Sequence, residues 1–324
     1  IKIEEAIEKL HFEVNEVARG LKTYRTKTIG IILPELNNIF FSEIITAAED
    51  LLRSHGYATM ICDCRSDVKR EEEAAEFLLH RRVDGLIMMP TGAEKKVFDR
   101  FRKSGRPVVL IDRRMENGDC DRVLVDNEGA AQNAVKRLMK KGHKKIGMIT
   151  GPDNVYTARE RQRGYELAIQ ESSKARSAQQ SDLKGKTDRT DTKLLADGNY
   201  TIAGGANAMR KLYEDNPDMT AVFISNYEMT VGAMMEINDL GIKVPEQLSV
   251  IGFDNMDFAR AVVPRLTIVT QPTEEIGQAA ANLLLSHLED KDETPDKTSD
   301  KIETTETIWL KTGFVEGESV ADIS

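Results

Sequence analysis

Three polar residues stand where they could bind the hydroxyl groups of a ligand. Asp254 and Asn226 each follow directly after an apolar run with the composition of a buried strand. A carboxylate accepts hydrogen bonds from hydroxyls, and an amide both donates and accepts them. Arg161 lies in a predicted helix, and its guanidinium can hold two adjacent hydroxyls or a carboxylate. The alternatives are a loop cap for Asp254 and a surface ion pair of Arg161 with Glu160 or Glu166.

The usual signatures of enzyme active sites are absent from the sequence. There is no G-x-G-x-x-G or G-x-x-x-x-G-K-[ST] phosphate loop, no H-E-x-x-H zinc motif and no G-x-S-x-G elbow. Residues 66–69 match S-x-x-K and 311–313 match K-T-G, but no S-D-N accompanies them. The histidines are scattered, and the cysteines lack zinc-site spacing. We therefore predict a binding protein with no catalytic residues, no metal and no cofactor.

Short apolar runs alternate with amphipathic helical patterns from about residue 28 onward. The predicted strands are 29–33, 57–63, 85–89, 108–112, 145–150, 221–225 and 248–253. The predicted helices are 41–55, 69–82, 94–104, 128–141, 158–170, 228–240 and 273–288. This alternation indicates βαβ units in more than one sheet, so we predict an α/β protein of two lobes, each a doubly wound parallel sheet. Two polar stretches interrupt the rhythm, and we predict a mobile surface insertion at 172–195 and a surface connection at 290–306.

Composition limits the class of protein. The 324 residues suffice for about two domains, and 40% of them are hydrophobic, as in globular proteins. No run approaches the length of a membrane span, and neither an export signal nor a disulfide framework is evident, so we expect a cytoplasmic protein. The net charge of −9 argues against a protein that binds nucleic acid over its whole surface.

A short basic segment near the start contrasts with the acidic total. Residues 2–10 have helical spacing, and Asn15 is a candidate N-cap for a second short helix, 16–21. Between residues 15 and 27 the charges sum to +3. Such a segment suits a polyanion, and the alternative is an ordinary solvated helix.

Short motifs recur in a fixed order along nearly the whole chain. The segment 15–23 reads NEVARGLKT and leads into TIGIILP at 28–34. The further motifs lie at 38–41, 83–87, 108–113, 125–127, 142–146, 159–165, 251–255 and 266–272. Together they resemble the lac-repressor/galactose-repressor family of bacterial transcription regulators.

This resemblance implies a DNA-binding headpiece, a hinge helix and a core like the periplasmic sugar-binding proteins, with the effector bound in a cleft between two lobes. The implied domains are 1–27 for a headpiece remnant and hinge helix, 28–126 plus 272–301 for the N-terminal lobe, and 127–271 plus 302–324 for the C-terminal lobe. Leu21 is the expected apolar wedge in the DNA minor groove, with Asn15, Arg19 and Lys22 as further DNA-binding residues. The family's helix-turn-helix would precede Ile1, so we expect operator binding only with the full headpiece.

The resemblance also implies the residues of the effector site. The expected effector-binding residues are Arg161, Asp254, Asn226, Tyr200, Phe41, Asp112, Thr157 and Gln271. The aromatic face of Tyr200 suits the apolar face of a sugar ring. Tyr227 stands where the family usually has an Asp, a position that more often caps the following helix than contacts the ligand.

We therefore predict a homodimeric repressor controlled by a small-molecule effector, either a sugar or a sugar derivative. The effector would act by binding two states of the protein with different affinity. Two alternatives are an exported sugar-binding transport protein and a regulator whose effector is a phosphorylated protein partner.

Overall fold

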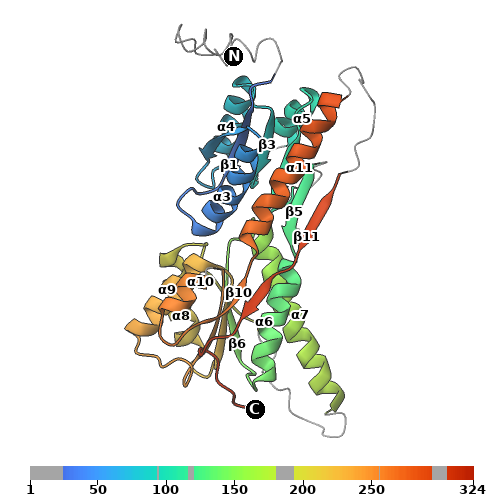
Figure 1. The fold of residues 1–324 in the computed structure, drawn as a ribbon. Helices are drawn as coiled ribbons and strands as arrows, with labels where there is room; N and C mark the ends of the chain where they lie inside the picture. The colour runs from blue at the N-terminus through green and yellow to red at the C-terminus, as the bar shows by residue number, and fades with distance from the viewer. Residues whose placement is uncertain (1–24, 93–94, 116–119, 180–192, 255, 294–304) are drawn as a thin grey trace, which may run out of the picture. The chain divides into compact units, whose positions relative to one another are not determined.

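The computed structural model describes residues 25–92, 95–115, 120–179, 193–254, 256–293 and 305–324. These residues form two compact units (Figure 1). Unit 1 comprises the described residues up to Val123 together with those of Thr273–Ile308, and unit 2 comprises those of Leu124–Pro272 and Trp309–Ser324. The chain thus passes between the units three times, and the last passage lies later than the expected point after residue 301. The predicted headpiece remnant and hinge helix lie outside the described residues.

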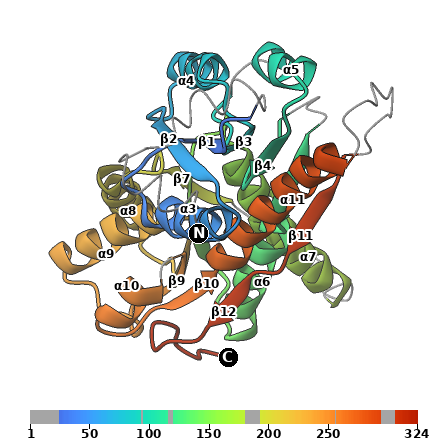
Figure 2. The same cartoon turned by 45° about the horizontal axis from the view of Figure 1, so that its top comes forward.

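Unit 1 is built on a six-stranded sheet, sheet A, in the order β11-β5-β4-β3-β1-β2. Its strands are β1 (Thr28–Leu33), β2 (Ala58–Asp63), β3 (Gly85–Met88), β4 (Val108–Ile111), β5 (Asp121–Val125) and β11 (Thr307–Leu310). The strands from β1 to β5 pair in parallel. Helices α3 (Ile39–Ser54) and α11 (Thr273–Glu293) pack together on one face of the sheet, and α4 (Val68–His80) and α5 (Lys95–Lys103) cover the other (Figure 2).

Unit 2 repeats this plan with sheet B, in the order β12-β10-β9-β8-β6-β7. Its strands are β6 (Ile146–Thr150), β7 (Leu194–Asp197), β8 (Ala221–Ile224), β9 (Ser249–Phe253), β10 (Thr267–Thr270) and β12 (Gly313–Val315). Only β12 pairs antiparallel among the described strands of this sheet. Helices α6 (Asn127–Lys140) and α7 (Tyr156–Gln179) pack together, as do α8 (Ile202–Asp215) and α9 (Tyr227–Asp239), and the short α10 (Met256–Ala261) precedes β10.

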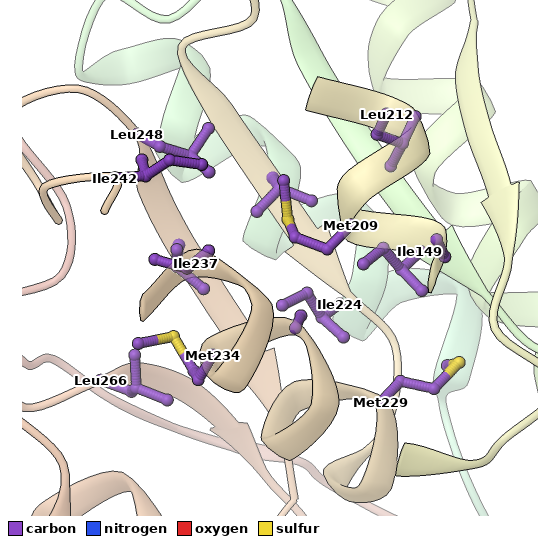
Figure 3. Close-up of a cluster of buried hydrophobic side chains, with 14 of the residues drawn as sticks. Ile149, Met209, Leu212, Ile224, Met229, Met234, Ile237, Ile242, Leu248 and Leu266 are labelled. Atoms are coloured by element: carbon purple, nitrogen blue, oxygen red, sulfur yellow. The ribbon is translucent and has the colours of Figure 1, made fainter. Parts of the chain in front are cut away.

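Apolar side chains fill the space between sheet B and its helices. Figure 3 shows one cluster, in which Ile149 and Ile224 of the strands are buried with Met209 of α8. A second cluster joins the sheet to α6 and α7 and contains Tyr165, whose hydroxyl donates to the carbonyl oxygen of Ile146 at 2.8 Å. Burial raises the pKa of Tyr165 to about 12, so the phenol stays neutral and serves as a structural hydrogen-bonding group.

Local sequence fixes where the helices begin and how closely they pack. Side-chain oxygens of Asn38, Asp67, Asp126, Thr201 and Asn226 cap the first turns of α3, α4, α6, α8 and α9. Gly164 lies where α7 crosses α6, and a Cβ at this position would come within 2.1 Å of the carbonyl oxygen of Glu128. Glycine therefore allows the two helix backbones to approach.

The predicted insertion at 172–195 was wrong at both ends. Helix α7 continues to Gln179, and β7 begins at Leu194. The last turns of α7 are polar, and β7 directly follows a long polar stretch, so composition alone missed both. Strands β5, β10, β11 and β12 and helix α8 are also absent from the predicted elements. Helix α11 likewise extends to Glu293, into the stretch predicted as a surface connection.

No helix in the described part of the chain is long and apolar enough to cross a bilayer.

Candidate functional site

The polar residues predicted to bind a ligand gather at the carboxyl edge of sheet B. Strand β6 lies between β7 and β8, so the chain leaves β6 toward one side of the sheet and later returns to pair on its other side. The loops after β6 and β8 lead to α7 and α9, which belong to different helix pairs. Such a topological switch point is where open parallel sheets bind ligands.

Arg161 is the centre of this edge. Its side chain is buried, with the residue only 3% exposed. Nε donates to Oδ1 of Asn127 at 2.8 Å, and Nη1 donates to the carbonyl oxygen of Ser225 at 2.6 Å. The guanidinium carbon lies 3.8 Å from the centroid of the Phe253 ring. These contacts fix the guanidinium before any ligand arrives, and they exclude the alternative of a surface ion pair with Glu160 or Glu166.

Asp254 supplies the opposite charge. Its Oδ2 lies 3.9 Å from Nη1 of Arg161, and its Oδ1 accepts from Nε2 of Gln271 at 2.7 Å. The backbone of Asp254 has a φ of 65°, in the left-handed region that few residues other than glycine adopt. Strain of this kind concentrates at binding sites, where the surrounding structure holds it in place. Asp254 therefore belongs to a charge network and is not simply a loop cap.

Asn226 caps a helix at this edge. Its Oδ1 accepts from the backbone N–H of Met229 at 3.0 Å, which makes Asn226 itself the N-cap of α9. Its Nδ2 donates to Oε2 of Glu228 at 2.6 Å. The cap of α9 is thus Asn226, one residue before the position of Tyr227 to which the resemblance assigns it. Asn226 still lies at the site, because it directly follows Ser225, whose carbonyl oxygen Arg161 binds.

Tyr200 and Thr157 lie together at the end of β6. The Tyr200 hydroxyl and Oγ1 of Thr157 are 3.2 Å apart and hydrogen-bonded. The Tyr200 ring covers Gly151, since a Cβ built there would lie 2.3 Å from Cε1 of the ring. Glycine is therefore needed directly after β6 for the aromatic ring to lie over this edge of the sheet.

The two remaining predicted effector residues, Phe41 and Asp112, are in unit 1. Phe41 is buried in the first turn of α3, with its ring centroid 5.4 Å from that of Phe40. Asp112 follows β4 as Asp254 follows β9, and each of these strands is fourth from the β2 or β7 edge of its sheet. Their φ angles agree as well, at 63° and 65°. The duplicated fold thus places one strained carboxylate at the same topological position in each unit.

Three residues were missed as site candidates in the sequence. Asn127 orients Arg161, and the fully buried Ser225 has a hydroxyl without a hydrogen-bond partner among the described residues. Arg113 is 8% exposed, and its Nε lies 3.4 Å from Oδ2 of Asp112. Arg113 could have been found from the sequence, because it directly follows a predicted strand and Asp112.

Two other predictions concern different parts of the chain. The expected DNA-binding residues lie outside the described residues. They are Asn15, Arg19, Leu21 and Lys22.

Within the described residues, no group of three or more His, Cys, Asp or Glu side chains could hold a metal ion. The three cysteines are free thiols, and burial is the main cause that raises the pKa of Cys62 and Cys64.

Comparison with known proteins places the chain in a family. Residues 135–320 match the model of the periplasmic binding protein-like domain. Catabolite control protein A of Priestia megaterium is 32% identical over 89% of this chain and 82% of its own length. The repressor PurR of Vibrio atlanticus is 30% identical over 90% of this chain and 83% of its own length. The chain belongs to the LacI family of transcription regulators.

A solved structure of the family agrees with this assignment. A LacI family transcriptional regulator from Enterococcus faecium with bound ribose superposes with a TM-score of 0.74 and 26% identity. The match covers 92% of this chain and all of that chain. The LacI family member described here is thus an effector-controlled transcription repressor on a two-unit α/β fold, and the expectation of this family and fold is confirmed.

Proposed function

We propose that the repressor binds a sugar at the carboxyl edge of sheet B and that this sugar controls its affinity for operator DNA. The observation that carries the proposal is the buried Arg161, fixed by Asn127 and Ser225 with Asp254 3.9 Å away. A buried charge is costly unless it is paired and hydrogen-bonded, and removing one partner of such a pair is strongly destabilising. Because this charged network lies at the edge where open parallel sheets bind ligands, it supports a binding role in addition to its contribution to the fold.

The chemistry of the edge fits a neutral polyol. A guanidinium has five N–H donors, and protein acceptors within the described residues take two of those on Arg161. The others can donate to ligand hydroxyls, while the carboxylate of Asp254 can accept from them. The Tyr200 ring offers an aromatic face of the kind that sugar rings stack against. A ribose-bound relative makes ribose the first sugar to test.

The control of DNA binding then follows from differential affinity. A ligand shifts an equilibrium between two protein states only as far as it binds them unequally. Operator affinity and sugar affinity are therefore reciprocally linked: a sugar that lowers operator affinity must itself bind more weakly to the DNA-bound protein. DNA binding through Asn15, Arg19, Leu21 and Lys22, with a full headpiece, is part of this proposal.

The proposal includes a homodimer, and the exposed apolar side chains support it. Ile61 on β2, the edge strand of sheet A, is 42% exposed, and Ile202 and Met235 on α8 and α9 are 46% and 56% exposed. An exposed apolar side chain on an edge strand favours pairing of that edge with a second copy. We further propose that the protein acts in the cytoplasm, where its DNA target is, and that it has no catalytic activity of its own.

A thermal-shift screen tests the proposal. The repressor is heated with pentoses, hexoses, sugar acids, sugar phosphates and purines, because a ligand that binds only the folded state raises Tm by mass action. We expect a sugar to give the largest shift. A shift by purines alone, or by no small molecule at all, would contradict the sugar-controlled repressor, and the second outcome would favour a protein effector.

A further inference from the structure

Basic side chains gather at the amino edge of sheet A, beside the point where the described chain begins. Helices α4 and α5 pack side by side and end at this edge (Figure 1). The loops that follow them lead into β3 and β4, and the backbone N–H of Leu86 donates to the carbonyl oxygen of Pro107 between them. We call this surface the basic ledge and define it as Arg81, Arg82, Arg102, Lys103 and Arg106.

The two loops that form the ledge contain little acidic compensation, although the end of α11, with the exposed Glu289, lies near the same edge. Residues 80–84 and 102–107 contain these five basic residues and a single acidic one, Asp84. The Asp84 carboxylate accepts from the backbone N–H groups of Thr26 and Lys27 at 2.9 and 2.8 Å, so it is directed at the incoming chain. Arg81, Arg82 and Lys103 are exposed, and in the part of the chain that the structure describes none of them forms an ion pair. The nearby ion pair of Glu76 is with Arg100.

Helix chemistry explains only part of this cluster. Cations are favoured at helix C-termini, which accounts for Arg102 and Lys103 at the end of α5. Arg82 and Arg106 lie in the loops beyond the helices, and Arg82 has a φ of 58°. Burial lowers the pKa of Arg106, Asp84 opposes this, and the charge of Arg82 adds to the lowering. Arg82 and Arg106 thus lie in neighbouring loops, and Asp84 affects Arg106 more strongly than Arg82 does.

The position of the ledge in the fold indicates which kind of anion it would bind. Thr26 Oγ1 donates to the carbonyl oxygen of Arg82 at 3.0 Å, so the chain enters unit 1 directly beside the ledge. The preceding residues, 15–27, carry a net charge of +3 and include the expected DNA-binding residues. The net charge of −9 disfavours DNA binding over the whole surface, so a basic surface directly beside the expected DNA-binding segment is well placed to hold a duplex.

We propose that the basic ledge binds the phosphate backbone of duplex DNA, as a sequence-independent contact from the core in addition to the N-terminal segment. The proposal rests on the DNA-binding function proposed above. Arginine and lysine side chains that contact phosphates position a protein on the duplex without reading its sequence. The ledge would therefore raise affinity for any duplex and would make binding more sensitive to salt.

The test compares two triple variants of the full chain for binding to a fluorescein-labelled duplex of random sequence across a salt series. One variant, Arg81→Gln/Arg82→Gln/Lys103→Gln, neutralises the ledge. The matched control, Lys140→Gln/Lys144→Gln/Lys211→Gln, removes three exposed charges from unit 2. We expect the ledge variant to lose at least about tenfold in affinity and its log K–log[salt] slope to fall by up to about 2.7, at roughly 0.9 per phosphate contact. The control should match the wild type.

Three results would contradict DNA binding by the ledge. They are an unchanged affinity and slope in the ledge variant, an equal loss in the control, and an absence of duplex binding by the wild type at low salt. Unchanged thermal melting and sugar binding in both variants show that each is folded. Sugar binding is measured independently of DNA binding. If the ledge variant binds DNA like the wild type but the wild type binds a sugar, only the ledge proposal fails. If the wild type binds no sugar either, the proposed function fails as well.

Discussion

Nη1 of Arg161 donates a 2.6 Å hydrogen bond to the carbonyl oxygen of Ser225, which joins helix α7 to the carboxyl end of β8. The same guanidinium holds Asn127 at the start of α6. Arg161→Ala leaves both acceptors and the Asp254 carboxylate without their cation, so we expect it to lower the free energy of unfolding by about 3 kcal/mol. Urea denaturation measures this loss. A variant as stable as the wild type would show that the network contributes nothing to the fold.

The strained backbone of Asp254 predicts a contrast between two substitutions. Asparagine tolerates the left-handed region, so Asp254→Asn should lose stability only through the missing charge opposite Arg161, and it should weaken sugar binding by at least about tenfold because it removes a charged acceptor. Asp254→Ala should weaken binding similarly and should be less stable than Asp254→Asn by about 1 kcal/mol. Calorimetric titration and thermal melting separate the two effects. Tight sugar binding by Asp254→Asn would remove Asp254 from the site. Asp112→Asn, at the corresponding position of unit 1, tests that residue's predicted contact in the same way.

The packing of Tyr200 on Gly151 predicts an effect on binding without a change at the charged network. Gly151→Ala places a methyl group in contact with the Tyr200 ring and must displace it. We expect this variant and Tyr200→Ala to weaken sugar binding by roughly tenfold, since an aromatic contact contributes on the order of 1 kcal/mol. Tyr200→Phe keeps the ring and should bind nearly as well as the wild type. If all three variants bind the sugar as tightly as the wild type, Tyr200 does not stack on it.

Stability should fall on mild acidification because of His143. This side chain is buried, hydrogen-bonded to Thr220 and Ala321, and burial lowers its pKa below the ordinary value of 6.5. The unfolded chain therefore binds a proton more readily, so stability is full above pH 6.5 and is lost as the pH falls toward the folded-state pKa. Unfolding free energies at neutral pH and at about pH 5.5 measure the change. His143→Gln should reduce it and the exposed-site control His55→Gln should not; identical pH dependence in His143→Gln would contradict the assignment.

The homodimer makes a prediction about the edge of sheet A. Ile61→Asp adds a charge to the exposed side chain of β2, and we expect it to weaken self-association measured by sedimentation. Val263→Asp is the control, because Val263 is 92% exposed in a loop of unit 2. A wild type that sediments as a monomer, or an Ile61→Asp variant that dimerises as well as Val263→Asp, would contradict this interface.

The sequence predicted the parts of the fold that have a strong local signal. The βαβ rhythm, the family motifs and the positions of Arg161 and Asp254 after or beside buried strands were enough for the fold class and the charged pair. Strand β7 escaped detection because it directly follows a long polar stretch. Asn127 and Ser225 escaped it because they act through Arg161, and the contacts between α6, α7 and β8 that unite them are long-range. The capping role of Asn226 depends on backbone geometry that spacing does not reveal.

The most direct test of the central claim is calorimetric titration of ribose, or of the sugar that the thermal screen identifies, into the wild type, Arg161→Ala and Arg159→Ala. Arg159 lies two residues earlier on α7, is exposed, and donates to the carbonyl oxygen of Asp153. If Arg161 binds the effector, Arg161→Ala should lose about 100-fold or more in affinity, since each lost charge-assisted hydrogen bond contributes roughly 1.5–3 kcal/mol. Arg159→Ala should bind like the wild type. Equal affinities in all three proteins would contradict a sugar site centred on Arg161.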